Sequence, residues 1–325
     1  MSTGLTKKDQ KHLMLFSGRS HPALANEVAS ILDVDLVPMR AVTYANSEIY
    51  VRFEESVRGS DAFVIQSHHA PVNEWMMEQL IMVDALKRAS AKRITVVSPF
   101  YPYARQDKKH AGREPISARL MADLYLAAGA TRIMSVDLHA AQIQGFFSGP
   151  VDHLHAMPLL SEYVMAKYGT EDLVVVSPDA GRVRMADQWT DRLGATLAII
   201  HKRRDPNVAN TVAVHEVVGE VEGKVCLLVD DMIDTAGTIC LAADALMARG
   251  AKAVIAAATH AVLSGPAADR LNRSAFDEVI VTNTLPIDPS VHIDCLTVLS
   301  IAPLIAKAIK EVFMEGSVTS LMNEF

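Results

Sequence analysis

The sequence predicts an α/β protein made of two tandem, doubly wound, parallel-sheet domains. Short runs rich in β-branched residues alternate with helical patterns along almost the whole chain. Several of these runs are apolar at consecutive positions, as expected for strands that are covered on both faces of a parallel sheet. The length of 325 residues, half of them hydrophobic, also exceeds what a single domain usually holds.

The expected strands form two sets separated by a short irregular stretch. Between the strands, helical patterns cover 74–90, 115–128 and 237–249, and glycines follow the last two. Residues 149–158 contain one glycine, two prolines and no periodicity, so we expect one domain over 1–155 and a second over 156–325. The expected strands are 12–18, 61–67, 93–99 and 132–139 in the first set, and 173–179, 196–202, 224–231, 253–260, 277–284 and 296–300 in the second.

Composition excludes several classes of protein. Lys and Arg total 31 against 38 Asp and Glu, a net charge of −7, so the chain has no overall positive field to attract nucleic acid or an anionic membrane. The three cysteines are too far apart to predict a disulfide framework or a zinc site. With a polar N-terminal segment and no apolar run of about 18 residues, we expect a cytoplasmic protein without nucleic-acid or membrane partners.

Residues 225–238, VCLLVDDMIDTAGT, are the most informative segment of the sequence. They predict a buried strand that ends in Asp230 and Asp231, followed by a loop of small residues that opens a helix. Carboxylates accept hydrogen bonds from vicinal hydroxyls, and loop amides at a helix N-terminus attract phosphate. The segment therefore suggests a sugar phosphate, although an acidic pair at a strand end can instead hold a metal or cap a helix.

Four further segments narrow the interpretation to one family. They are FYPYARQDKKHAGREPIS at 100–117, SVDLHAAQIQGFF at 135–147, VVVSPDAGRV at 174–183 and IIHKRRDPNVAN at 199–210. Together with 225–238 they resemble ribose-phosphate diphosphokinases, almost end to end. This resemblance implies two domains of the phosphoribosyltransferase type and transfer of the β,γ-diphosphoryl group of ATP to the anomeric hydroxyl of ribose 5-phosphate.

The resemblance also implies roles for individual residues. Mg²⁺ is the expected cofactor, with ligands His139 and Asp179, and Lys202 and Arg204 are the expected catalytic residues. The expected ATP-binding residues are Tyr44, Asn46, Ser47, Glu48, Arg105 and Gln106. The expected ribose 5-phosphate-binding residues are Arg204, Asp230, Asp231, Asp234, Thr235, Ala236, Gly237 and Thr238.

Three positions depart from the commoner family pattern. Tyr44 stands where Phe usually stacks on adenine, and either ring offers a stacking surface. Ala236 replaces a glycine, which we expect to require ordinary backbone angles at that position. The loop after Asp179 differs from its usual form, so Arg182 and Arg184 receive no role.

The resemblance further implies a hexamer with an inhibitory nucleotide and phosphate site that involves Gln144, Asp152 and His153. Two other functions remain open. A phosphoribosyltransferase would use the same acidic loop without an ATP-binding segment, and a non-catalytic regulatory relative should have lost some of the catalytic residues.

Residues 201–211, HKRRDPNVANT, are expected to form a long polar hairpin loop, mobile without substrate, between two strands. In an extended chain, side chains two positions apart share a face. Lys202 and Arg204 should therefore point to the same side and Arg203 to the other.

Overall fold

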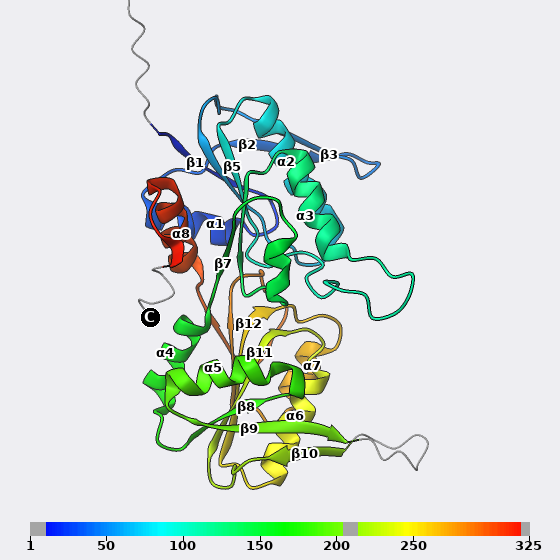
Figure 1. The fold of residues 1–325 in the computed structure, drawn as a ribbon, viewed down its shortest axis with the longest axis vertical. Coiled ribbons are helices and arrows are strands. Elements are labelled where there is room, and N and C mark those ends of the chain that lie inside the picture. Colours follow the sequence, from blue (N-terminus) through cyan, green and yellow to red (C-terminus); the bar gives the residue numbers. More distant parts are fainter. Residues whose placement is uncertain (1–10, 204–213, 320–325) are drawn as a thin grey trace, which may run out of the picture. The chain divides into compact units, whose positions relative to one another are not determined.

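The computed structural model describes residues 11–203 and 214–319, which form two compact units (Figure 1). Among these residues, the first unit comprises 11–153 and 302–319, and the second comprises 154–301. The sequence suggested a boundary between 155 and 156, with everything beyond it in the second domain. The stretch 302–319 instead belongs to the first unit, because its helix α8 (Ala302–Met314) packs against helix α1 (Pro22–Leu32).

The first unit is built on a sheet whose strands are covered by helices. The strand order is β1-β4-β5-β6-β7, and the first four of these strands pair in parallel. A separate antiparallel hairpin, formed by β2 and β3, packs beside it through Phe53, whose ring lies 4.7 Å from that of Phe16. The strands are β1 (Leu13–Ser17), β2 (Met39–Thr43), β3 (Ile49–Phe53), β4 (Asp61–Ile65), β5 (Arg93–Val97), β6 (Arg132–Val136) and β7 (Val151–Leu154), and the helices are α1 (Pro22–Leu32), α2 (Val72–Arg88), α3 (Ser117–Ala128), the short 3₁₀ helix η1 (Ala141–Gly145) and α8 (Ala302–Met314).

The second unit has a seven-stranded sheet in the order β10-β9-β8-β11-β12-β13-β14. All neighbouring strands are parallel except the hairpin pair β9 and β10. The strands are β8 (Leu173–Ser177), β9 (Thr196–Arg203), β10 (Val214–Val218), β11 (Val225–Ile233), β12 (Ala253–Ala261), β13 (Glu278–Thr282) and β14 (Leu296–Leu299), and the helices are α4 (Met157–Tyr168), the 3₁₀ turn η2 (Ala180–Arg182), α5 (Val183–Leu193), α6 (Gly237–Ala248) and α7 (Ala267–Asn272).

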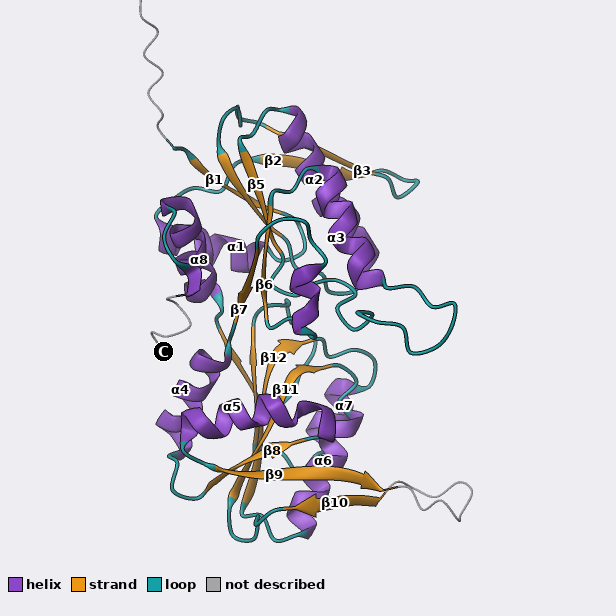
Figure 2. Cartoon of the chain, in the orientation of Figure 1, coloured by secondary structure: helices purple, strands orange, loops and turns teal. Residues whose placement is uncertain are grey.

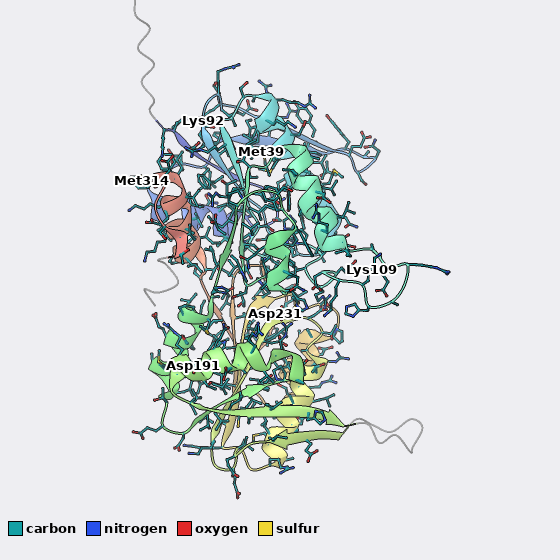
Figure 3. All side chains as sticks on the ribbon, in the orientation of Figure 1. Met39, Lys92, Lys109, Asp191, Asp231 and Met314 are labelled. Carbon is teal, nitrogen blue, oxygen red and sulfur yellow. The ribbon has the colours of Figure 1, made fainter. Side chains whose placement is uncertain are left out.

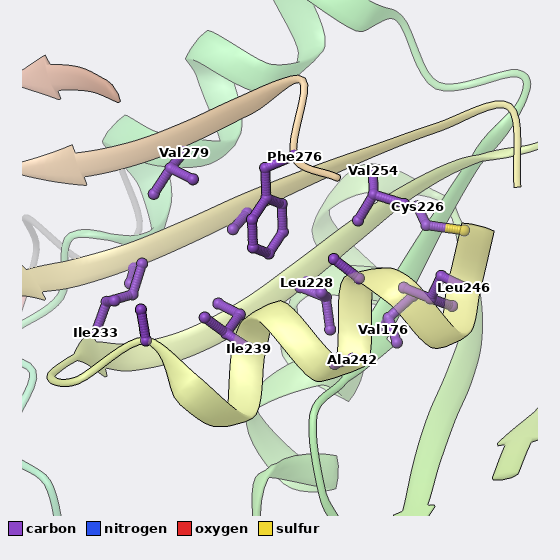
Figure 4. Close-up of a cluster of buried hydrophobic side chains, with 14 of the residues drawn as sticks. Val176, Cys226, Leu228, Ile233, Ile239, Ala242, Leu246, Val254, Phe276 and Val279 are labelled. Atoms are coloured by element: carbon purple, nitrogen blue, oxygen red, sulfur yellow. The ribbon is translucent and has the colours of Figure 1, made fainter. Parts of the chain in front are cut away.

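Helix α6 packs one apolar face against the sheet of the second unit (Figure 4). Ile239, Ala242 and Leu246 lie three or four residues apart and are buried among Leu228 and Val254 of the strands. Burial of a side chain as large as Leu contributes about 1.5–3 kcal/mol. This packing fixes the N-terminus of α6, and with it the loop before the helix.

All ten expected strands and the three expected helices are present, so the prediction of an α/β fold with doubly wound sheets is confirmed. Figure 2 shows the strands in orange and the helices in purple. Two details were wrong. Residues 151–154 of the expected irregular connection form strand β7, and β11 continues to Ile233, beyond the acidic pair. Among the described residues, no helix is both long and apolar enough to cross a membrane.

Candidate active site

The acidic pair of the second unit, Asp230 and Asp231, lies in the part of strand β11 that extends beyond its pairing with the neighbouring strand β8. The register between these strands ends at Leu228 of β11, whereas β11 stays paired with β12 as far as Ile233. Asp230 and Asp231 therefore lie within β11, past the end of its pairing with β8. The segment that follows β8 is free to approach them, because parallel strands present their carboxyl ends at one edge of the sheet.

Arg182, in the turn η2, binds both carboxylates of this pair. Its Nε lies 2.9 Å from Oδ1 of Asp230, and its Nη2 lies 2.5 Å from Oδ1 of Asp231. Asp231, which is labelled in Figure 3, is almost completely buried, and its amide also donates to Oδ1 of Asp230 over 2.8 Å. Burial and the adjacent Asp231 carboxylate raise the pKa of Asp230, while the Arg182 guanidinium opposes that rise.

The loop from Asp234 to Thr238 joins β11 to the N-terminus of helix α6. The side chain of Asp234 accepts a hydrogen bond from the Ser264 hydroxyl, and its carbonyl accepts one from the Ser264 amide over 3.1 Å. Arg270 donates from Nη1 to the carbonyl oxygen of Thr235 over 2.8 Å. Ser264 and Arg270, which lie outside the loop, therefore hold its backbone and Asp234 in place. The side chains of Thr235 and Thr238 stay exposed.

Ala236 is the N-cap residue of α6 and has φ +58° and ψ 2°. The expectation of ordinary backbone angles here was wrong, since this is the left-handed conformation that favours glycine. The residue is nonetheless buried, and its methyl group packs in the core of the second unit. The turn geometry therefore persists without the glycine.

Four expected ATP-binding residues lie together on the turn between β2 and β3 in the first unit. They are Tyr44, Asn46, Ser47 and Glu48, all of them exposed. The amide of Tyr44 donates to the Glu48 carbonyl, that of Ser47 to the Tyr44 carbonyl, and that of Glu48 to Oδ1 of Asn46. This closed turn presents the Tyr44 ring to solvent as a flat surface on which an adenine could stack.

Arg105 and Gln106 lie in the long loop between β5 and α3, which also carries Lys109 (Figure 3). Gln106 is fixed at the start of α3, because its Oε1 accepts a hydrogen bond from the Ser117 hydroxyl over 2.6 Å. Arg105 is exposed, as are Lys108 and Lys109. The loop therefore presents exposed cationic side chains that can bind an anion, and Gln106 fixes part of the loop.

The two expected metal ligands belong to different units. In the first, His139 is half-buried three residues after β6, and the amide of Leu138 beside it donates to Nε2 of His153 over 2.8 Å. In the second, Asp179 caps η2, with its Oδ1 accepting from the amides of Gly181 and Arg182.

The carboxylate of Asp179 fits a magnesium ion, which prefers oxygen ligands, whereas the imidazole nitrogen of His139 is an unusual direct ligand for such an ion. The contacts to Oδ1 orient the Asp179 carboxylate, and a carboxylate has acceptor capacity beyond two hydrogen bonds. Magnesium takes few protein ligands because it usually keeps several waters and binds substrate phosphates.

Of the two expected catalytic residues, Lys202 lies near the end of strand β9, and Arg204 comes directly after the strand in sequence. The backbone of Lys202 belongs to β9 and pairs with His215 of β10, so it lies on a strand and not in the expected loop. Arg204 lies outside the described residues, as does most of the expected loop.

Sequence reasoning missed two arginines of the second unit, Arg182 and Arg270. Arg182 stands only three residues after Asp179, where the departure from the usual loop gave a signal. Arg270 lies in α7, far along the chain from the loop it holds, and no local pattern indicates its contact.

Comparison with known proteins places this arrangement in one family. Residues 13–129 match the N-terminal domain of ribose phosphate pyrophosphokinase, and residues 206–323 match the phosphoribosyl synthetase-associated domain. The ribose-phosphate pyrophosphokinase of Streptomyces coelicolor is 66% identical over 322 residues, covering 99% of both chains, and that of Corynebacterium glutamicum is 61% identical over 318 residues, covering 98% of both.

A solved structure agrees with these relatives. The chain resembles the crystal structure of phosphoribosylpyrophosphate synthetase from Mycobacterium smegmatis with a TM-score of 0.90 and 62% identity, over 94% of this chain and 100% of that one. The chain therefore belongs to the ribose-phosphate pyrophosphokinase family and is an ATP-dependent diphosphotransferase.

Proposed function

We propose that this enzyme transfers the β,γ-diphosphoryl group of ATP to the anomeric hydroxyl of ribose 5-phosphate, using the residues described above. The observation that carries the assignment is the segment from Asp230 to Thr238. It joins two carboxylates, which accept hydrogen bonds from ribose hydroxyls, to a loop at the N-terminus of α6, which suits the 5-phosphate. A sugar phosphate satisfies both parts.

The other proposed contacts follow from the chemistry of the substrates. Tyr44 stacks on adenine, while Asn46, Ser47 and Glu48 hold its edge, and Arg105 and Gln106 bind the nucleotide. His139 and Asp179 hold Mg²⁺, which neutralises charge on the phosphates when it is bound. Lys202 binds the transferring diphosphate and Arg204 the phosphates of the substrates, so that both stabilise the charge that develops during transfer.

We also propose a cytoplasmic homohexamer, on the basis of the family resemblance. Gln144, Asp152 and His153 would contribute to its regulatory nucleotide and phosphate site. Arg132 binds Asp152 through two contacts of 2.8 Å, and the Gln144 side chain lies 3.3 Å from Nδ1 of His153. All three residues therefore already have side-chain partners.

The direct test is to incubate the protein with ATP, Mg²⁺ and ribose 5-phosphate and to measure AMP together with a ribose-dependent diphosphate ester. A parallel incubation with the diphosphate ester and a nucleobase, without ATP, tests the phosphoribosyltransferase alternative. Formation of a nucleotide in the second incubation, without AMP in the first, would overturn the proposal. Absence of both activities would favour the regulatory alternative.

Variants separate the binding roles. Asp230→Asn should weaken ribose 5-phosphate binding far more than ATP binding, because its carboxylate faces the sugar hydroxyls. His139→Ala should raise the magnesium requirement without unfolding the protein, since the side chain is only half-buried. An unchanged magnesium titration in folded His139→Ala would reject His139 as a ligand.

A further inference from the structure

Arg182 joins two separate parts of the second unit. Its amide donates to Oδ1 of Asp179 at the start of η2, while its guanidinium contacts Oδ1 of both Asp230 and Asp231 in β11. These contacts connect the segment after β8 to the neighbouring strand, beyond the point where the two strands stop pairing. The residue is therefore held through both its main-chain amide and its guanidinium, and its side chain is only 20% exposed.

The acidic pair needs a nearby cation. Asp230 and Asp231 are adjacent in sequence, and their side chains are 25% and 2% exposed. Two neighbouring carboxylates repel each other, and a buried carboxylate without a partner is strongly destabilising. A planar guanidinium matches this arrangement because it can donate to two carboxylates from a fixed fork, which a lysine ammonium cannot do.

The contact of Arg182 with Asp230 and Asp231 is also compatible with the binding of ribose hydroxyls by these two carboxylates. A guanidinium has only donors, so it takes up acceptor sites without supplying a competing acceptor. Each ionised carboxylate offers about four acceptor positions on two oxygens, so contacts to Oδ1 leave capacity for hydroxyl donors. Arg182 therefore fixes the direction of the two carboxylates without blocking them.

We propose that Arg182 is a positioning residue for ribose 5-phosphate, which holds Asp230 and Asp231 as an oriented pair of acceptors for the ribose hydroxyls. This inference rests on the proposed assignment of the pair to the sugar. Arg182 acts through the two carboxylates and not on the reacting atoms. Its loss should therefore weaken sugar binding and leave the nucleotide unaffected.

The experiment compares Arg182→Ala and Arg182→Lys with Arg184→Ala, an exposed arginine two residues further along. Loss of hydrogen bonds to charged groups costs about 1.5–3 kcal/mol, so Arg182→Ala should raise the KM for ribose 5-phosphate at least about tenfold. The KM for ATP should stay within about twofold. Arg182→Lys should fall between Arg182→Ala and the wild type because it keeps the charge without the fork, and Arg184→Ala should match the wild type.

Calorimetric titration with ribose 5-phosphate and a double-mutant cycle with Asp230→Asn separate the possible failures. If the inference holds, Arg182→Ala costs much less sugar affinity in the Asp230→Asn background than in the wild type. If Asp230→Asn leaves sugar affinity unchanged, the proposed sugar site is wrong. If Asp230→Asn weakens sugar binding while folded Arg182→Ala does not, or tightens it, Arg182 does not position the pair.

A thermal unfolding scan of each variant accompanies these titrations. Should Arg182→Ala fail to fold, Arg182→Lys carries the test. A wild-type affinity for ribose 5-phosphate in folded Arg182→Lys, together with a wild-type KM, would then overturn the inference, because the fork would be unnecessary.

Discussion

The guanidinium of Arg270 in helix α7 donates to the carbonyl oxygen of Thr235, over 2.8 Å, in the loop that precedes helix α6. The same nitrogen lies 3.1 Å from where a Cβ on Gly237 would be, so the side chain also fills the space beside that glycine. Helix α7 is short, yet through this contact it stabilises the proposed phosphate-binding loop.

Arg270→Ala should therefore raise the KM for ribose 5-phosphate by roughly fivefold, because the lost hydrogen bond is exposed to solvent and contributes about 1 kcal/mol. The KM for ATP should not change. Arg273→Ala is the matched control, because Arg273 is exposed at the end of the same helix. Steady-state kinetics with each substrate varied in turn would measure both values, and equal effects of the two substitutions would contradict the role of Arg270.

The left-handed backbone conformation of Ala236 leads to a second prediction, which concerns the stability of the protein. A β-branched residue in the left-handed conformation is strained, so Ala236→Val should lower the free energy of unfolding by about 2 kcal/mol or more. In Ala236→Gly, relief of backbone strain opposes the loss of a buried methyl group and the greater freedom of the unfolded chain, and the net change should stay within about 1 kcal/mol. Urea unfolding of the two variants would test this order, and similar stabilities would refute it.

His68 predicts a dependence of stability on pH. Burial lowers the pKa of His68 from 6.5 to about 4, despite its hydrogen bond with the carbonyl of Phe100. The unfolded chain then binds a proton more readily than the folded chain between pH 6.5 and about 4, so the free energy of unfolding should fall as the pH falls through this window. The loss should approach about 3 kcal/mol.

The measurement for His68 is urea unfolding at several pH values, for the wild type and His68→Gln. His69 also has a lowered pKa because of burial, and its contribution is common to both proteins. The difference between the two curves therefore isolates His68. Parallel curves for the two proteins would show that His68 does not titrate in this way.

Glu278 predicts a further loss of stability at lower pH. Burial alone would raise the pKa of its carboxyl, but hydrogen bonds from Thr297, Tyr168, Lys167 and Tyr163 outweigh burial and lower the pKa to about 2. Since the folded pKa lies below the ordinary value of 4.5, the stabilisation is complete above pH 4.5 and declines as the pH falls toward 2. Glu278→Gln should lack this acid-dependent part, which differential scanning calorimetry from pH 5 downward would detect.

Lys202 and Arg203 lead to a prediction about turnover. Both belong to β9, where Lys202 pairs with His215 and Arg203 with Val214, so they occupy alternate positions of an extended strand. Lys202→Ala and Arg204→Ala should each lower kcat by orders of magnitude with little change in ATP affinity, because their proposed role is to stabilise charge in the transition state. Arg203→Ala should lower kcat only mildly. A decrease in kcat equal to that of the other two variants would exclude the expectation that Lys202 and Arg204 alone share the catalytic face.

The strands could be predicted from the sequence because a strand that is buried on both faces appears as a run of consecutive apolar residues. Residues 61–65 are apolar after the first position and buried throughout, and residues 225–233 are apolar except for Asp230 and Asp231. Strands β2 and β3 were missed because their residues alternate between half-buried and exposed positions and form a separate hairpin. The end of β11 was placed too early, because its pairing with β12 continues past two charged residues.

The site could be predicted where its residues are neighbours in sequence, as Asp230 to Thr238 are. The contacts of Arg182 and Arg270 could not be predicted. Arg182 binds residues at least 48 positions further along the chain, and Arg270 binds a residue 35 positions before it. Which side chains meet over such separations depends on strand order and helix packing. The left-handed conformation of Ala236 was missed for a related reason. Local preference favours glycine there, whereas the packing of α6 against the sheet sets the backbone of the turn.

Helix α8, formed by residues 302–314, packs against α1, formed by residues 22–32, so the first unit contains segments from far apart in the chain. During synthesis on a ribosome, the sheet of this unit leaves the exit tunnel long before α8 does. The apolar surface of α1 that α8 later covers stays exposed while the whole second unit is made, and closing the contact requires ordering across nearly 300 residues. The second unit, 154–301, is continuous and can complete its core first, so the order of folding need not follow the order of translation.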